Sequence, residues 1–531
     1  MLLVPVRALA ALTVLWAVTP LMAEAPTLRI VVPQELAGLT PYSPGVPEPL
    51  LELVYDKLAA PSPYLATASP WLARSILPEG SDGQAWHIRL RENIRWHDGQ
   101  TFSAEDVAFT LRYYRDGPAN RWTHHASETP RLESIEVVGR LNLRIRCAHP
   151  CPDFDRVTAA DLPILPAHLW RGVKQPHRYR GAIVGTGPYR VAALKPGRYL
   201  RLEANPDYFG GTPRVNRLLI SFVRNPATAF AALSAGELDF AVTPVPPELR
   251  ASLARQPGLA LMHGKRPLNA VEIRINFERP PFTDSRFRRA LALALDPAEI
   301  VQRVALGFGL AGSAGYPHPH SPWTAKDLTQ LACDPASAAR ELDVLGFKDR
   351  DKDGWRETAE GLPLRFSLKV ASSESLHLRA AQVVARQLKA VGIAVRVEAI
   401  DPGRHRALLA DRQFDLMIAE IGAHGLSDPD QFVESFRSGY LWRAGTPHPK
   451  LDALLEDWQK TRTPAQRLAA SFALQRFHSQ APSTLVLYYP ESYQAYRPKV
   501  YDRWRHVPGQ GAMHKWSLLD LRYPVPGLTA P

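Results

Sequence analysis

Helix alternates with strand in both halves of this chain, and that alternation most constrains its fold. The clearest case is an amphipathic helix expected over 376–391, with strands expected over 364–370, 393–400 and 414–419. A similar unit lies around 227–242 in the first half. Because a helix that joins two parallel strands packs on their sheet, each half is expected to form its own α/β lobe.

The length of 531 residues is more than one hydrophobic core serves, so several domains are expected, although no internal repeat is visible. Lys and Arg exceed Asp and Glu by 64 to 52, which gives a net charge of +12. The basic residues are scattered and form no run of five. This distribution favours a solvated surface over a nucleic-acid-binding face.

The first 23 residues have the pattern of a secretory signal peptide. Arg7 precedes an apolar run over 8–18, and small residues lead to the expected cleavage between Ala23 and Glu24. The run is shorter than the ~20 apolar residues that span a bilayer. No cysteine stands at the cleavage point, so a free periplasmic protein is expected and not a lipid-anchored one.

Three cysteines remain for an oxidising compartment. Cys147 and Cys151 flank Ala-His-Pro, a turn short enough for a local disulfide. The alternative is a metal site with His149, which has too few further ligands nearby. Cys333 is expected to be a small buried residue.

The stretch over 84–114 contains the most distinctive motif. Trp86, Ile88 and Leu90 alternate as in a strand, and a second short strand is expected over 94–96 before the Asp-Gly turn. Ser103 and Asp106 have the spacing of a capping box at the start of a helix. These residue choices are explained by structure and require no catalytic role.

The wording of this stretch nevertheless resembles a known family. IRLRENIRWHDGQTFSAEDVAFTL, VGTGPYRVAALKPGRYLRLEANPDYFGG and NFERPPFTDSRFRRALALALDPAEIV are similar to phrases of the bacterial extracellular solute-binding proteins of family 5, the dipeptide and oligopeptide receptors of ABC importers. The resemblance implies an α/β, bilobal periplasmic-binding-protein fold (type II, cluster C-like) with an extra inserted domain. It also implies a monomer that closes over its ligand at a hinge and delivers it to an inner-membrane ABC permease, without nucleic acid or a required cofactor.

The expected division has a signal peptide at 1–23 and lobe I at 24–47, 183–265 and 490–531. An inserted subdomain of lobe I is expected at 48–182, and lobe II at 266–489. In open α/β sheets, ligands bind beyond the carboxyl ends of strands, which directs attention to the segment after the strand over 414–419.

That segment departs from the family pattern. In peptide-binding members, an aspartate three residues before an Asp-Pro-Asp triplet takes the α-ammonium of the peptide; the corresponding residue here is Gly425. An unpaired buried ammonium costs several kcal/mol. The expected ligand is therefore a peptide-like or other polar solute, with Glu420 as a shifted anchor and His424 and Ser427 beside it.

Further candidate ligand-binding residues are aromatic or charged. Aromatic rings suit a flat or polar solute, and Arg and Asn near the lobe crossing suit an anionic group. The candidates are Tyr42, Trp442, Tyr488, Tyr489, Arg274 and Asn276.

An acidic loop follows the helix expected over 335–345. Asp349, Asp351, Asp353 and Glu360 have the spacing of a calcium loop, and Gly354 stands at the turn. A strand follows where a paired motif has a helix, so a solvated acidic turn is the alternative. Any calcium there would be structural.

Two other classes of protein are alternatives. An exported hydrolase would use the histidine pairs His124 and His125 or His318 and His320, but no H-E-x-x-H or G-x-S-x-G motif is present. A solute-sensing regulatory domain is suggested by the charge of +12, but no helix-turn-helix precedes residue 28. A binding protein with no enzymatic activity is the favoured interpretation.

Overall fold

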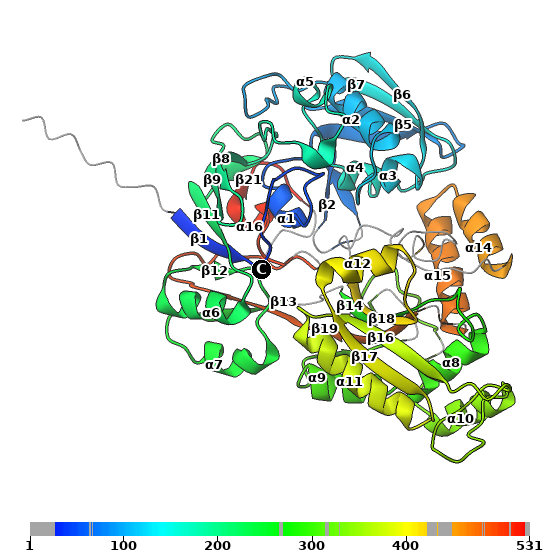
Figure 1. Ribbon diagram of the computed structural model, residues 1–531. Helices are drawn as coiled ribbons and strands as arrows, with labels where there is room; N and C mark the ends of the chain where they lie inside the picture. The colour runs from blue at the N-terminus through cyan, green and yellow to red at the C-terminus, as the bar shows by residue number, and fades with distance from the viewer. Residues whose placement is uncertain are drawn as a thin grey trace, which may run out of the picture.

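The structure is a computed structural model and describes residues 27–62, 65, 67–264, 269–313, 318–328, 330–421, 433, 449–480, 482, 484–508 and 511–525. Two large sheets form the centres of two lobes, and a smaller sheet lies in a subdomain beside the first lobe (Figure 1). Among the described helices, none combines the length and the apolar character needed to cross a bilayer.

The sheet of lobe I has seven strands. Their order is β13 (Ala260–Gly264), β20 (Ser492–Tyr496), β12 (Phe240–Ala241), β1 (Thr27–Val32), β11 (Arg217–Phe222), β9 (Tyr199–Ala204) and β8 (Tyr189–Lys195). Strand β1 runs parallel to β11 and β12, which the helix α6 (Pro226–Ala235) connects. The sequence therefore predicted this unit correctly: Asn225 accepts a hydrogen bond at the start of α6, and Gly236 ends it with a φ of 81°.

The subdomain beside lobe I, which we call the inserted subdomain, has a four-stranded antiparallel sheet. Its order is β4 (Ala73–Glu79), β5 (Ala85–Leu90), β7 (Asn142–Cys147) and β6 (Leu132–Gly139), accompanied by α2 (Ala104–Asp116), α3 (His124–Ser127), α4 (Thr158–Asp161) and α5 (Ala167–Trp170). At the start of α2, the backbone N–H of Ser103 donates to Asp106 at 3.0 Å. The predicted capping box is therefore present.

The sheet of lobe II has six strands and is covered on both faces. Its order is β15 (Gly309–Ala311), β19 (Thr484–Pro490), β14 (Ala270–Ile275), β18 (Leu416–Ile421), β16 (Arg365–Ala371) and β17 (Ala394–Ile400). One face packs on α8 (Ser285–Ala294), α9 (Pro297–Val304), α10 (Pro335–Val344) and α11 (Ser375–Lys389). The other face packs on α12 (Pro402–Ala410), α14 (Pro449–Gln459) and α15 (Pro464–Gln480). The parallel strands β16, β17 and β18 confirm the second predicted unit.

Shorter elements complete the fold. They are α1 (Glu48–Leu51), β2 (Ala59–Pro61), β3 (Ala68–Pro70), η1 (Pro176–Arg178), β10 (Gly211–Pro213), η2 (Pro247–Leu249), α7 (Arg250–Ala254), α16 (Lys515–Leu518) and β21 (Leu519–Leu521). Strands β2 and β3 pair, as do β10 and β21.

The apolar residues from Leu50 to Leu58 have helical spacing, but the helix α1 ends at Leu51. The carbonyl of Leu53 accepts from the N–H of Tyr189, and the carbonyl of Val54 accepts from the N–H of Gly187, each at 2.9 Å. A β-carbon on Gly187 would lie 2.6 Å from the carbonyl oxygen of Leu53. The two backbones thus meet directly. The strand expected over 94–96 is likewise reduced to one bridge between Arg95 and Thr101.

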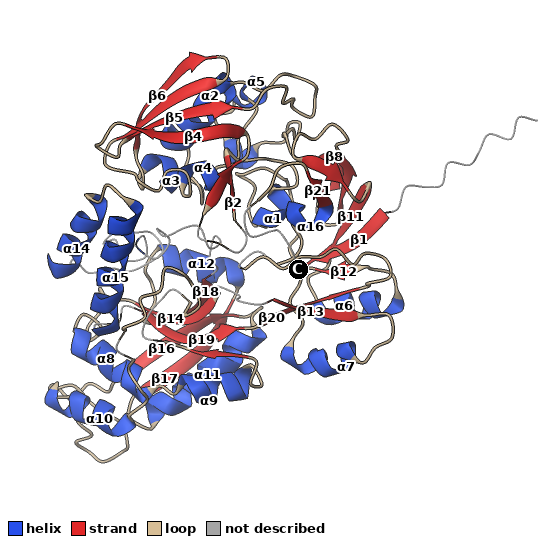
Figure 2. Cartoon of the chain, turned by 180° about the vertical axis from the view of Figure 1, so that it is seen from behind, coloured by secondary structure: helices blue, strands red, loops and turns tan. Residues whose placement is uncertain are grey.

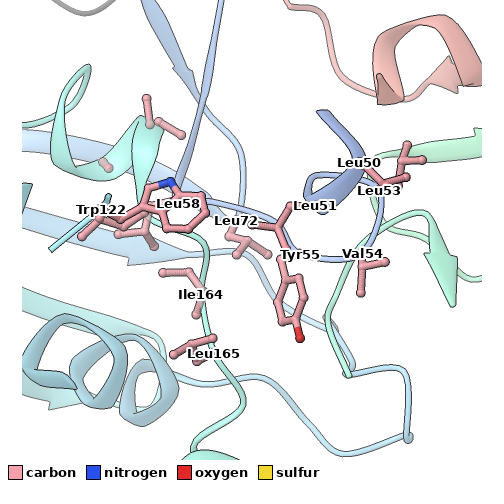
Figure 3. Close-up of a cluster of buried hydrophobic side chains, with 14 of the residues drawn as sticks. Leu50, Leu51, Leu53, Val54, Tyr55, Leu58, Leu72, Trp122, Ile164 and Leu165 are labelled. Carbon is pink, nitrogen blue, oxygen red and sulfur yellow. The ribbon is translucent and has the colours of Figure 1, made fainter. Parts of the chain in front are cut away.

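One apolar core runs through lobe I and the inserted subdomain. Figure 3 shows Leu51 and Tyr55 beside Ile164 and Leu165, with Trp122 and Leu58 at the other end of the group. Lobe II has its own core. The inserted subdomain and lobe I share a continuous apolar core, whereas the core of lobe II is separate. The inserted subdomain and lobe I therefore form one unit that faces lobe II.

Candidate functional site

The candidate site lies at one edge of the lobe II sheet. The carboxyl ends of β18 and β19 meet there, together with the start of the antiparallel strand β14. Val271 of β14 is paired with Glu420 on one side and Tyr488 on the other, so the three side chains share a face. The chain also passes between the lobes at this edge, because only Glu491 separates β19 from β20 of lobe I.

Glu420 has two polar neighbours. Asn269 donates from Nδ2 to Oε1 of Glu420 at 2.7 Å, and Nε2 of His377, near the start of α11, lies 3.7 Å from Oε2. Surrounding atoms desolvate the Glu420 carboxylate and raise its pKa, but hydrogen bonding and charge from His377, with the bond from Asn269, bring the pKa below its usual value. The ionised carboxylate is therefore favoured, and 38 % of the Glu420 side chain remains exposed to solvent.

Tyr488 is affected by the same carboxylate. Burial, with an added contribution from the charge of Glu420, raises the pKa of Tyr488 well above its usual value. The phenol therefore keeps its proton at neutral pH. The site offers an anionic acceptor beside a neutral phenol.

Contacts near α11 show that this edge faces lobe I. Arg379, two residues after His377, forms an ion pair with Glu248 of lobe I. Close by, the guanidinium of Arg250 in lobe I lies 4.2 Å from the ring centre of Phe308 and 4.3 Å from that of Tyr493. The predicted anchor Glu420 thus lies where the lobes meet.

Tyr489 is on the opposite face of β19 from Tyr488. Its hydroxyl shares a hydrogen bond with Oγ of Ser313 at 2.7 Å, and its ring meets that of His318 edge-on at 4.7 Å between centroids. Arg274 donates from Nε to the fully buried Glu272 at 3.1 Å. These side chains lie on the sheet face that α12, α14 and α15 cover, away from the face of Glu420.

Two predicted ligand contacts have structural roles instead. Asn276 is buried, and its amide donates to the carbonyls of Arg412 and Phe414 at 2.8 and 2.9 Å, so it fixes the turn before β18. Tyr42 is buried against the inserted subdomain, where its ring packs against those of Tyr114 and Trp170, among others. Asn276 was suggested by its position near the lobe crossing and Tyr42 by its aromatic ring, but neither property reports which groups lie opposite.

Four predicted site residues, His424, Gly425, Ser427 and Trp442, lie outside the described residues. Two described neighbours of Glu420, His377 and Asn269, were missed. The predicted helix after the strand over 364–370 was the available signal for His377, because helix starts and strand ends meet at the same edge of an α/β sheet.

The acidic loop gathers carboxylates, but not all those predicted. Ligand oxygens of Asp349, Asp351, Asp353 and Glu357 lie within 4.8 Å of one another. Glu360 is therefore replaced by Glu357, because the bridge between Lys348 and Glu357 folds the loop into a hairpin. These hard oxygen ligands suit calcium.

The two histidine pairs considered for a hydrolase lie in different parts of the protein. Nδ1 of His125 lies 2.8 Å from Asp161 inside the inserted subdomain, whereas His318 accepts at Nδ1 from the backbone N–H of His320 in lobe II. A disulfide joins Cys147 and Cys151. Cys333 is exposed, so the expectation of a buried residue was wrong; it stands in the loop just before α10.

The family model described as "Bacterial extracellular solute-binding proteins, family 5 Middle" matches residues 67–442, well over half of the chain. The oligopeptide-binding protein AppA of Bacillus subtilis is 26 % identical over 474 residues, which cover 84 % of this chain and 83 % of AppA. The structure of AppA with a nonapeptide superposes with a TM-score of 0.79 over 94 % of this chain and 99 % of that chain, at 23 % identity.

NikZ of Campylobacter jejuni in complex with Ni(L-His) also has a TM-score of 0.79, at 23 % identity, over 92 % of this chain and 97 % of that chain. These neighbours confirm the bilobal α/β fold. The chain belongs to the bacterial extracellular solute-binding proteins of family 5.

Proposed function

We propose that this chain is the receptor of an ABC importer that binds a peptide or a peptide-like or other polar solute between its two lobes. The observation that most supports this proposal is the position of Glu420, an ionised carboxylate at the sheet edge where the chain crosses between the lobes. Closure of the lobes at that crossing would surround the ligand and present the closed form to a membrane permease.

The charge of Glu420 specifies part of the ligand. The sequence has Gly425 where peptide-binding relatives have the anchoring aspartate. Glu420, five residues earlier in the sequence, supplies a carboxylate instead, and the phenol of Tyr488 adds a polar group. A cationic amine on the ligand would pair with Glu420, since a carboxylate favours a positive partner when water is excluded.

The fold alone does not select the solute, because one structural neighbour holds a nonapeptide and another Ni(L-His). Binding without turnover is proposed, with export through a cleaved leader, a periplasmic location and a monomeric state. Ligand capture by a monomer needs only one pair of lobes.

The test begins with native mass spectrometry of the freshly purified protein, to detect a retained solute. Tripeptides to nonapeptides are then titrated by calorimetry, each with a free and with an acetylated N-terminus. Binding of the free form without hydrolysis supports a peptide receptor. Hydrolysis of a bound peptide would contradict the receptor function. If no peptide binds and the retained solute is not a peptide, the ligand belongs to another class of polar solute.

Glu420→Gln tests the proposed anchor. The variant is expected to bind the free-amine ligand at least about tenfold more weakly, which is about 1.4 kcal/mol. Glu398→Gln is the matched control. Glu398 lies on β17, the edge strand of the same sheet, and pairs with Lys369 of the neighbouring strand β16. Equal affinity of the wild type and Glu420→Gln would remove Glu420 from the site.

A further inference from the structure

Helix α15 of lobe II lies against the inserted subdomain, at a contact separate from the chain crossing (Figure 1 and Figure 2). Nη2 of Arg467 donates to the carbonyl oxygen of Pro150 at 3.0 Å. Nε of the same guanidinium lies 3.5 Å from Oδ2 of Asp153. One arginine thus holds both a carbonyl and a carboxylate across the boundary between lobe II and the inserted subdomain.

This ion pair is buried. The side chain of Arg467 is 4 % exposed and that of Asp153 is 3 % exposed. Trp458 of α14 supports the arginine, whose guanidinium carbon lies 3.8 Å from the ring centre. A buried, oriented guanidinium is held more firmly than an exposed one, because fewer rotamers and fewer waters compete for it.

Another ion pair joins lobe II to lobe I, but its side chains are much more exposed. Arg379 and Glu248 are 40 % and 44 % exposed, and exposed pairs contribute little to an equilibrium. Of these two described pairs, the one at Arg467 therefore has the larger effect on how the sides stay together.

The inserted subdomain is built to keep Asp153 paired when the lobes separate. Arg156 of the same subdomain forms an ion pair with Asp153, and its guanidinium carbon lies 5.3 Å from the ring centre of Trp323 in lobe II. On separation Asp153 would retain Arg156, while Arg467 would gain water. Neither state leaves the carboxylate buried without a cation, so the contact can form and break reversibly.

The disulfide fixes the other partner of Arg467. Cys147 and Cys151 enclose Pro150 in a short loop, and the N–H of Cys151 donates to the carbonyl of Gly83 at 2.8 Å. The carbonyl of Pro150 is therefore presented at a fixed place. Arg467 meets an acceptor that does not have to be ordered first.

We propose that Arg467 is a positioning residue for solute capture: its contacts with Asp153 and the carbonyl of Pro150 latch lobe II to the inserted subdomain and set the population of the closed form. The role in capture rests on the proposed receptor function, but the latch itself is a property of the protein alone. A ligand that prefers the closed form would bind more tightly when the latch is intact, because less of its binding free energy is used to close the lobes.

Distances between spin labels test the latch in the full exported chain. Cys333 is free and exposed in lobe II, and Leu77 is exposed on β4 of the inserted subdomain, so Leu77→Cys with native Cys333 provides two labels while the disulfide stays intact. Pulsed electron paramagnetic resonance then measures the short-distance and long-distance populations. The ratio of short to long is expected to fall at least tenfold in Arg467→Gln, and by less in Arg467→Lys.

Arg476→Gln is the matched control, because Arg476 is on the same helix but pairs with Asp327 inside lobe II. It is expected to leave the distance distribution unchanged. Equal distributions in the wild type and Arg467→Gln, a lower melting temperature without a change of distribution, or a wild type with only the long distance would each overturn the proposal. Since no solute or permease is used, these results do not decide the proposed transport function.

Discussion

His97 connects the inserted subdomain to lobe I and should make the stability of the protein fall in mild acid. Its Nε2 lies 2.9 Å from the carbonyl oxygen of Gly187 and donates to it, while Nδ1 accepts from the N–H of Gly185 at 3.2 Å. Only the neutral ring satisfies both contacts. Desolvation is the main cause that lowers the pKa of His97 to about 4.

The sign follows from comparing the folded and unfolded states. An unfolded histidine has a pKa of about 6.5. Between pH 6.5 and pH 4, His97 is therefore mostly protonated in the unfolded chain and mostly neutral in the folded protein. The stability contributed by neutral His97 is complete above pH 6.5 and is lost as the pH falls toward 4. Between pH 7 and pH 5 the loss from this residue is about 2 kcal/mol.

Urea unfolding at pH 7, 6 and 5 measures this effect in the wild type and in His97→Gln. The variant is expected to be less stable at pH 7 by about 1 kcal/mol, because a hydrogen bond is lost. By pH 5 the wild type should have lost about 2 kcal/mol that the variant keeps, since glutamine does not titrate, so the variant should then be more stable than the wild type by about 1 kcal/mol. The exposed His149→Gln is the control. A difference between wild type and His97→Gln that stays constant from pH 7 to pH 5 would refute the reasoning.

Two further perturbations address buried charge and the acidic loop. Lys515→Met leaves the buried Asp56 without the ammonium that lies 3.0 Å away, and is expected to cost about 3–5 kcal/mol in the free energy of unfolding, measured with urea. Adding Asp56→Asn should recover part of that loss; no recovery would show that the charge was not its cause. Calcium at about 1 mM is expected to raise the melting temperature of chelated protein through Asp351 and Glu357, and to have no effect on Asp351→Asn. An equal rise in both proteins would exclude the loop as the site.

Local signals explain what the sequence predicted well. Asn225 marks the start of α6 and Gly236 its end, and Ser103 with Asp106 marks the start of α2. Such residues are found near helix ends because they satisfy the free N–H and C=O groups there. Such contacts are visible in the order of the residues. The α/β lobes followed from these elements and from the short links between them.

Contacts between distant residues explain the failures. The carbonyls of Leu53 and Val54 are taken by residues more than 130 positions later, so an apolar helical spacing did not become a helix. Asn269 reaches Glu420 across 151 positions, and no local pattern indicates that partner. The anchor could be predicted from the end of its strand; its neighbours required the fold.

The order of the strands in lobe I has a consequence for the time at which this lobe can fold. Strand β20 (Ser492–Tyr496) lies between β13 and β12, so the sheet is interrupted until almost the whole chain is present. The described strands of the lobe II sheet, by contrast, all come from the continuous stretch between Ala270 and Pro490. A chain that emerges from its N-terminus can therefore complete lobe II first, whereas lobe I closes its sheet only after the last strands arrive. Folding of the whole protein is tied to the arrival of its C-terminal segment.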